Sequence, residues 1–218
     1  GFSTKQYVFD GCVSIRELVL EMPTVPQDFD SAFFKQGWYN YQSGEFEVYQ
    51  YGPTVSTNAV SVIFGDTTTT IEDNAFSGCV GPASLVFGSG TVNINGGFRD
   101  CVGLTNIVFG AGTVNIDGGF YDCDGLMNLV FGDGAVSIDG GAFADCNGLT
   151  NIVFGSGVTN IGDYAFENCA GLTAVTIPAS VTSIGAAPFA DCTSLTNISV
   201  AAENPAYRDI GGVLFSKD

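Results

Sequence analysis

Hydrophobic residues in the second half of the chain follow a regular alternation that predicts short β-strands. Within residues 104–123, large apolar residues recur two positions apart in two places, at Ile107 and Phe109 and again at Val114 and Ile116. A period of two residues is that of a strand with one buried face. Glycines follow both strands, and the segment closes on Phe-x-x-Cys, whose i, i+3 spacing suits one helical turn with both side chains inward. Two strands and one turn are therefore predicted for each such segment.

The Phe-x-x-Cys pattern shows that this segment is a repeating unit. Its cysteines are Cys12, Cys79, Cys101, Cys123, Cys146, Cys169 and Cys192. The last six are separated by 22 or 23 residues, and the 67 residues between the first two match three units, so two degenerate copies fit there. A unit this short cannot bury a core of its own, and neighbouring units must share one. The sequence predicts a mainly β solenoid of 22–23-residue units with short strands and one-turn helical segments.

Stacked units place equivalent residues above one another at roughly the 4.8 Å spacing of paired strands. Three internal ladders follow from this alignment. The first contains Phe64, Phe87, Phe109, Phe131 and Phe154. The second contains Phe76, Phe98, Phe120, Phe143, Phe166 and Phe189. The third contains Ile71, Ile94, Ile116, Ile138, Ile161 and Ile184.

These motifs carry a resemblance to a known family. Residues 177–200 read IPASVTSIGAAPFADCTSLTNISV, which resembles the BspA-type, Treponema-like class of leucine-rich repeat. The tail NPAYRDIGGVLFSKD, residues 204–218, is similar to a segment that often follows such arrays. Five units depart from the family by placing Phe-Gly where Ile-Pro is usual. The resemblance implies a surface or secreted protein of bacteria or protists, linked to adhesion and protein binding, without catalytic residues.

The chain is predicted to form one leucine-rich-repeat solenoid domain over residues 1–218. Residues 1–58 are divergent N-terminal repeats with an aromatic-rich insertion, residues 59–200 are regular repeats, and residues 201–218 are the C-terminal tail motif. Neither end shows a clear polar cap. The chain also opens on Gly1 and Phe2 rather than Met, which indicates processing or a piece of a longer protein. A cap hidden within residues 1–9, or head-to-tail stacking of copies, would also account for the bare ends.

Composition narrows the function. Six Lys and Arg stand against 23 Asp and Glu, for a net charge of −17, and no cation occurs between Arg99 and Arg208. Nucleic acid and anionic lipid are bound through cations, so neither is expected as a partner. The absence of histidine removes the commonest general base. No apolar run approaches the roughly 18 residues of a membrane span. No enzyme activity, cofactor or membrane insertion is expected.

Two polar columns have a chemical and a structural interpretation. The cysteines could form disulfides or bind metal, but an odd number of stacked thiols and the lack of C-x₂₋₄-C spacing favour buried free thiols. A carboxylate row accompanies them at Asp100, Asp122, Asp145 and Asp191, and a second acidic set contains Asp117, Asp139 and Asp163. These could hold Ca²⁺. Capping of the adjacent turn by backbone N–H groups is the favoured interpretation.

Candidate binding residues lie in two places. One is the exposed side of the first strand, which is nearly uncharged and combines an apolar column with Thr and Asn; its candidates are Asn106, Val108, Asn128 and Asn151. The alternative is that β-branched residues simply favour strands. The other is the aromatic segment 33–51, where Trp and Tyr suit an interface or a sugar. Its candidates are Trp38, Tyr39, Tyr41, Tyr49 and Tyr51. Large side chains that fill an expanded coil are the alternative there.

The leading hypothesis is a non-catalytic extracellular or cell-surface recognition module that binds a protein or glycan. The alternative is a structural protein whose solenoids stack on copies of themselves into a larger assembly or filament.

Overall fold

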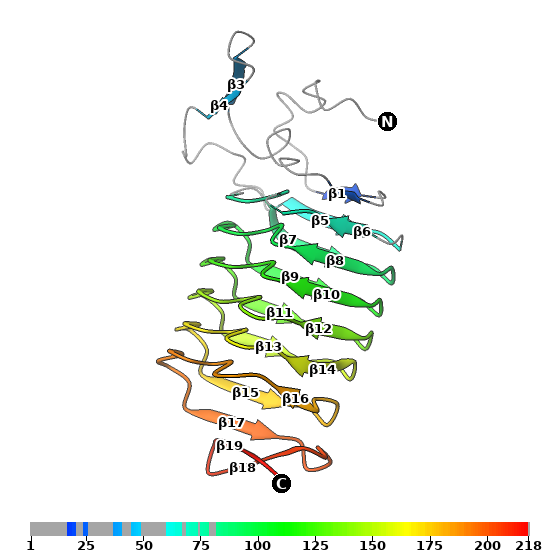
Figure 1. Ribbon diagram of the computed structural model, residues 1–218. Helices are drawn as coiled ribbons and strands as arrows, with labels where there is room; N and C mark the ends of the chain where they lie inside the picture. Colours follow the sequence, from blue (N-terminus) through cyan, green and yellow to red (C-terminus); the bar gives the residue numbers. More distant parts are fainter. Residues whose placement is uncertain are drawn as a thin grey trace.

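The computed structural model describes residues 17–20, 24–25, 37–40, 45–48, 60–66, 69–73, 75–78 and 82–217. Within these ranges the chain forms strands and turns and no helix, and its coils stack along one axis (Figure 1). The predicted solenoid is confirmed. Where a one-turn helical segment was expected, the Phe-x-x-Cys segment forms a single turn, closed for example by a hydrogen bond from Cys192 N to Phe189 O at 3.4 Å.

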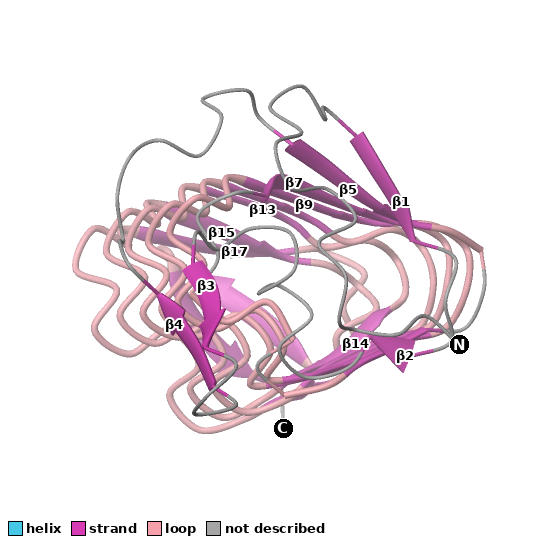
Figure 2. Ribbon diagram, turned by 90° about the horizontal axis from the view of Figure 1, so that it is seen from above, coloured by secondary structure: helices cyan, strands magenta, loops and turns pink. Residues whose placement is uncertain are grey.

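Two parallel sheets run the length of the stack. Sheet A contains β1 (Glu17–Leu20), β5 (Val60–Phe64), β7 (Pro82–Phe87), β9 (Asn106–Phe109), β11 (Asn128–Val130) and β13 (Asn151–Val153), in that order. Sheet B contains β2 (Thr24–Val25), β6 (Thr69–Ile71), β8 (Val92–Asn95), β10 (Val114–Asp117), β12 (Val136–Ile138), β14 (Val158–Ile161) and β16 (Ser183–Ile184). Seen along the stack, the sheets form two sides of each coil and loops close the rest (Figure 2).

Three further strand pairs complete the described chain. β15 (Ala174–Ile177) and β17 (Asn197–Val200) pair in parallel and follow β13 along the same side of the stack (Figure 1). β18 (Tyr207–Ile210) and β19 (Val213–Ser216) form an antiparallel hairpin at the C-terminal end. β3 (Gly37–Asn40) and β4 (Glu45–Val48) form a second antiparallel hairpin.

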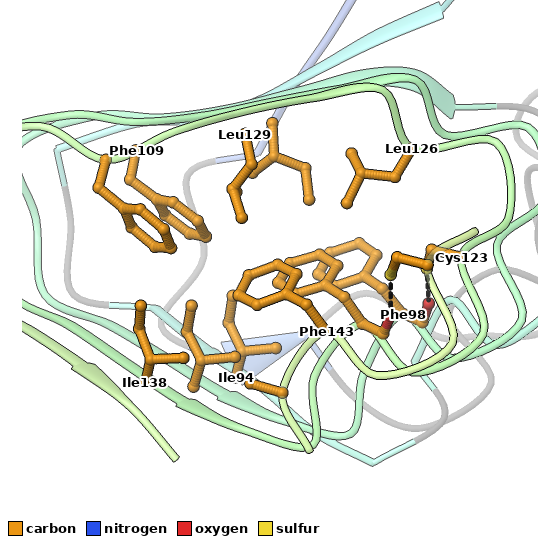
Figure 3. Close-up of a cluster of buried hydrophobic side chains, with 14 of the residues drawn as sticks. Ile94, Phe98, Phe109, Cys123, Leu126, Leu129, Ile138 and Phe143 are labelled. Carbon is orange, nitrogen blue, oxygen red and sulfur yellow. Dashed lines mark hydrogen bonds between the residues drawn. The ribbon is translucent and has the colours of Figure 1, made fainter. Parts of the chain in front are cut away.

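The core contains the three predicted ladders together with buried leucine, valine and cysteine side chains. Rings of the first phenylalanine column stack face to face at centroid distances of 4.6–5.8 Å, and those of the second at 4.7–5.6 Å. The two columns meet edge to face, for example Phe131 against Phe143 at 6.1 Å and 83°. The isoleucine column packs beside them (Figure 3). Aromatic pairs contribute about 0.5–1.5 kcal/mol beyond the burial of their area, so the ladders help to hold neighbouring coils together.

Glycine follows the first phenylalanine because successive turns touch backbone to backbone. A Cβ at Gly132 would lie 2.2 Å from Gly110 O, and one at Gly134 would lie 1.9 Å from Gly112 O. These contacts leave no space for any side chain. The substitution of Phe-Gly for Ile-Pro therefore reflects the close approach of the Phe-Gly-x-Gly turns, rather than a backbone conformation that only glycine adopts.

The cysteine column lies on the third side of each coil, where the turns of successive coils are joined by hydrogen bonds. Each described cysteine is buried, and its Sγ donates to the phenylalanine carbonyl of the preceding unit, as from Cys123 to Phe98 at 3.0 Å (Figure 3). Cys169 donates to Phe143 in the same way at 3.3 Å. Burial raises the pKa of the Cys146 thiol well above its usual range, which keeps it a donor. Buried thiols are thus confirmed for these residues, whereas Cys12 and Cys79 lie outside the described ones.

The C-terminal tail covers the last coil and forms a cap. The sequence had not indicated that the tail forms one. The β18–β19 hairpin packs on β17, and its Tyr207 and Leu214 side chains pack against the core. Tyr207 Oη accepts a hydrogen bond from Ile184 N at 2.9 Å. The cap was missed because its outward face is apolar, unlike the polar caps typical of solenoids.

Asn204 anchors this cap, and its loss is expected to loosen it. The buried side chain donates to Pro178 O at 2.7 Å and Val181 O at 2.9 Å, and accepts from the backbone N–H groups of Ala206 and Tyr207. At ~1 kcal/mol for each hydrogen bond, Asn204→Ala should lower the free energy of opening of the cap by about 2 kcal/mol or more. Amide hydrogen exchange of 207–216 measures this. Equal protection in both proteins would contradict the anchoring role.

Candidate functional site

The outward face of sheet A carries an ordered column of asparagine. Asn106, Asn128 and Asn151 pair directly in the strand register. Asn128 Nδ2 donates to Asn106 Oδ1 at 2.8 Å, and Asn106 Nδ2 donates to Thr105 Oγ1 at 2.8 Å. The side-chain amides of Asn106 and Asn128 therefore form hydrogen bonds within the sheet, which holds them in one orientation.

An apolar column lies two residues further along each strand. Val86, Val108, Val130 and Val153 are in register across β7 to β13. Val108 is 38% exposed and Val153 46% exposed, and Met127, one residue before the asparagine column, is 46% exposed. Strands β9, β11 and β13 contain no charged residue. This sheet thus presents a neutral, partly apolar surface on a strongly acidic chain.

The carboxylate row lies on the third side and has a backbone cause. Five residues there, all Asp or Asn, have φ between 55° and 59°: Asp100, Asp122, Asp145, Asn168 and Asp191. Asp and Asn adopt this left-handed conformation more readily than other side-chain-bearing residues, and Gly78 occupies the equivalent place in an earlier unit. The sequence predicted that the carboxylates of this row cap turns. The structure instead explains the row by the left-handed backbone that the residue before each described cysteine must adopt. N–H capping does occur in the second acidic set, where Asp163 accepts from Ala186 N at 2.6 Å.

Repulsion within the row changes its titration. Partial burial, followed by repulsion from Asp124 and Asp100, raises the pKa of the Asp122 carboxyl above its usual value. Asn168 shows a neutral alternative, since its Nδ2 donates to Asp145 Oδ1 at 2.6 Å. Among the described residues, no three Cys, Asp or Glu side chains are grouped so that they could hold a metal ion.

Comparison with known proteins agrees with this geometry. The model of the BspA type leucine rich repeat region matches six copies, over residues 54–119 and 117–217. The chain belongs to the BspA-type leucine-rich repeat family. A search of curated proteins found no significant match.

Two solved structures share the fold of this BspA-type chain. The pneumococcal vaccine antigen PcpA is 19% identical, with a TM-score of 0.57 over 95% of this chain and 46% of PcpA. A leucine rich cell surface protein from Faecalibacterium prausnitzii is 27% identical, with a TM-score of 0.57 over 72% of this chain and 42% of its own. The chain thus spans less than half the length of each protein.

The predicted binding residues of the BspA-type solenoid fall into two groups. Asn106, Val108, Asn128 and Asn151 lie together on the outward face of sheet A. Trp38 and Tyr39 lie in β3, opposite Glu47 and Phe46 of β4. Tyr41, Tyr49 and Tyr51 lie outside the described residues.

Met127 belongs with the first group but was not predicted. From residue 105 onward its column otherwise contains threonine, namely Thr105, Thr150, Thr173 and Thr196. A single exposed Met in a column of Thr is the signal that could have identified it. The described part of the chain contains no helix with the length and hydrophobicity of a membrane span.

Asp122→Asn is expected to stabilise the protein at neutral pH. The pKa of Asp122 is higher in the folded than in the unfolded protein, so folding favours the protonated carboxyl and ionised Asp122 destabilises the fold at pH 7. This destabilisation disappears as the pH falls below the pKa that Asp122 has in the unfolded chain. Removing the like charge should add roughly 0.5–1 kcal/mol at pH 7 and nothing at about pH 3.

Urea unfolding at both pH values measures the Asp122 effect. Asp133→Asn is the matched control, because hydrogen bonds from Ser156 N and then Oγ lower the pKa of Asp133, and folding favours its ionised form. Destabilisation by Asp122→Asn at pH 7 would contradict the repulsion.

Proposed function

We propose that this solenoid is a non-catalytic recognition module, exposed at a cell surface or outside the cell, that binds a protein partner on the outward face of sheet A. The observation that carries the proposal is the neutral surface of β9, β11 and β13, with Val108 and Val153 exposed, on a chain with a net charge of −17. An exposed apolar column on a rigid sheet is typical of an interaction surface.

Two further observations support the proposal. The described outward positions of β7 to β17 contain no aromatic side chain on which a sugar could stack, which favours a protein over a glycan. The similar proteins include one described as a leucine rich cell surface protein and one described as a vaccine antigen. Both descriptions suit a surface-exposed module.

A binding screen with matched variants tests this function. The intact chain is measured against purified extracellular proteins and glycans by biolayer interferometry, beside Val108→Asn/Val153→Asn and the sheet B control Thr159→Asn. We expect at least one protein to bind and the sheet A variant to weaken it about tenfold or more, equal to about 1.4 kcal/mol. A ligand that all three chains bind equally would place recognition elsewhere.

Self-assembly is a second candidate function, favoured by the cap. The outward face of the β18–β19 hairpin presents Ile210 at 57%, Val213 at 56% and Phe215 at 44% exposure. Such a face could seat a second copy end to end. Light scattering at rising concentration decides this, with Ile210→Ser/Phe215→Ser as the variant. A mass that stays monomeric would exclude assembly through the cap.

A further inference from the structure

A partly exposed apolar area of the sheet A face extends over β9, β11 and β13. Its apolar members are Val108, Met127, Val130 and Val153, and carboxylates lie at its two ends, Asp124 three residues before Met127 and Asp133 three residues after Val130. We call these six residues the β11 patch. Because Val108, Val130 and Val153 are in register, the patch is continuous across three coils.

We propose that the β11 patch binds a segment of a partner protein that presents apolar side chains between lysine or arginine residues. The inference rests on the proposed function and specifies the chemistry of its partner. The apolar column buries the partner's apolar side chains, and the two carboxylates receive its cations in charge-assisted hydrogen bonds.

Both carboxylates are held in position. Asp124 Oδ1 accepts from Asn147 Nδ2 at 2.8 Å. Asp133 Oδ1 accepts from Ser156 N at 3.1 Å and from Ser156 Oγ at 2.9 Å, and these bonds lower the pKa of its carboxyl, which keeps it ionised. Each carboxylate keeps further acceptor sites, because a carboxylate offers about four.

Charge decides between the possible occupants of the patch. No lysine or arginine occurs between Arg99 and Arg208, so the two carboxylates of the patch are not balanced by any cation in their own coil. A second copy carries −17 itself and is repelled at long range. A cationic partner is attracted by the same field, and its association is accelerated.

Synthetic peptides test the proposal on the intact chain. One peptide of about twelve residues alternates lysine and leucine, a second alternates lysine and serine, and a third alternates glutamate and leucine. At about 3.3 Å per residue, each is long enough when extended to run alongside residues 124–133. We expect the lysine–leucine peptide to bind most tightly. Met127→Ser/Val153→Ser and, separately, Asp124→Asn should each weaken it about tenfold or more.

Matched variants separate the patch from diffuse attraction. Asp117→Asn removes one charge from the end of β10 in sheet B, and Val213→Ser removes one exposed apolar side chain from the cap; both should keep full affinity. Equal binding of the lysine–serine peptide, or equal losses in the control variants, would overturn the proposal in favour of diffuse electrostatics.

The remaining outcomes distinguish this inference from the function beneath it. If the glutamate–leucine peptide binds and the Met127→Ser/Val153→Ser variant loses it, the face binds proteins but the cationic chemistry is wrong. If sedimentation shows a dimer that is lost in the Met127→Ser/Val153→Ser variant, the patch binds a second copy of the chain and the inference is wrong. If a protein ligand from the screen binds every β11 patch variant with the same affinity as the unchanged chain, both the inference and the proposed function are overturned.

Discussion

Phe120→Ala is expected to lower the free energy of unfolding by about 3–5 kcal/mol, the range for removing a buried aromatic ring. The ring is fully buried between Phe98 at 5.0 Å and Phe143 at 5.1 Å, and meets the edge of Phe109 at 6.3 Å. Truncation leaves a cavity in the middle of the stack. Because each coil is stabilised by its neighbours, the coils on either side lose part of their common interface.

Urea unfolding followed by circular dichroism measures the Phe120 effect. Phe215→Ala is the matched control, because that side chain is 44% exposed on the cap, and it should cost under ~1 kcal/mol. Hydrogen exchange should show the largest loss of protection at β9 to β12. A cost for Phe120→Ala as small as that of Phe215→Ala would show that the aromatic ladder does not hold the coils together.

Gly134→Val is expected to destabilise the protein by at least the about 1–3 kcal/mol typical of overpacking. A Cβ there would lie 1.9 Å from Gly112 O and 2.5 Å from Ala111 O, and both are backbone atoms of the preceding turn. Relief requires the two coils to separate, which also stretches the ladders on either side.

Gly141→Ala is the control for the Gly134 effect. Gly141 has a φ of 64° and no atom within 4 Å of an added Cβ, so its substitution measures backbone strain alone, at about 1–2 kcal/mol. Thermal unfolding of both variants compares them directly. A melting temperature for Gly134→Val at or above that of Gly141→Ala would contradict the backbone contact between turns.

Periodicity predicted the interior of this fold well. The intervals between cysteines placed both phenylalanine ladders and the isoleucine ladder correctly, because a solenoid converts sequence period directly into spatial register. The same intervals placed Asn106, Asn128 and Asn151 beside one another.

Features that depend on contacts between coils could not be predicted in the same way. The glycines of the Phe-Gly-x-Gly turns were interpreted as turn residues, but their reason is the carbonyl of the preceding coil. The aspartates before each cysteine were interpreted as caps, although Gly78 in the equivalent place indicates a left-handed backbone. The cap formed by 207–216 depends on Asn204 binding two carbonyls of the previous coil.

We propose that the outward face of sheet A, rather than the end of the stack, is the surface through which this protein binds its partner. A partner identified in the screen should be measured against Val108→Asn/Val153→Asn and against the cap variant Ile210→Ser/Phe215→Ser in one titration series. We expect about tenfold or greater loss of affinity for the sheet A variant and unchanged affinity for the cap variant. Loss confined to the cap variant would contradict it.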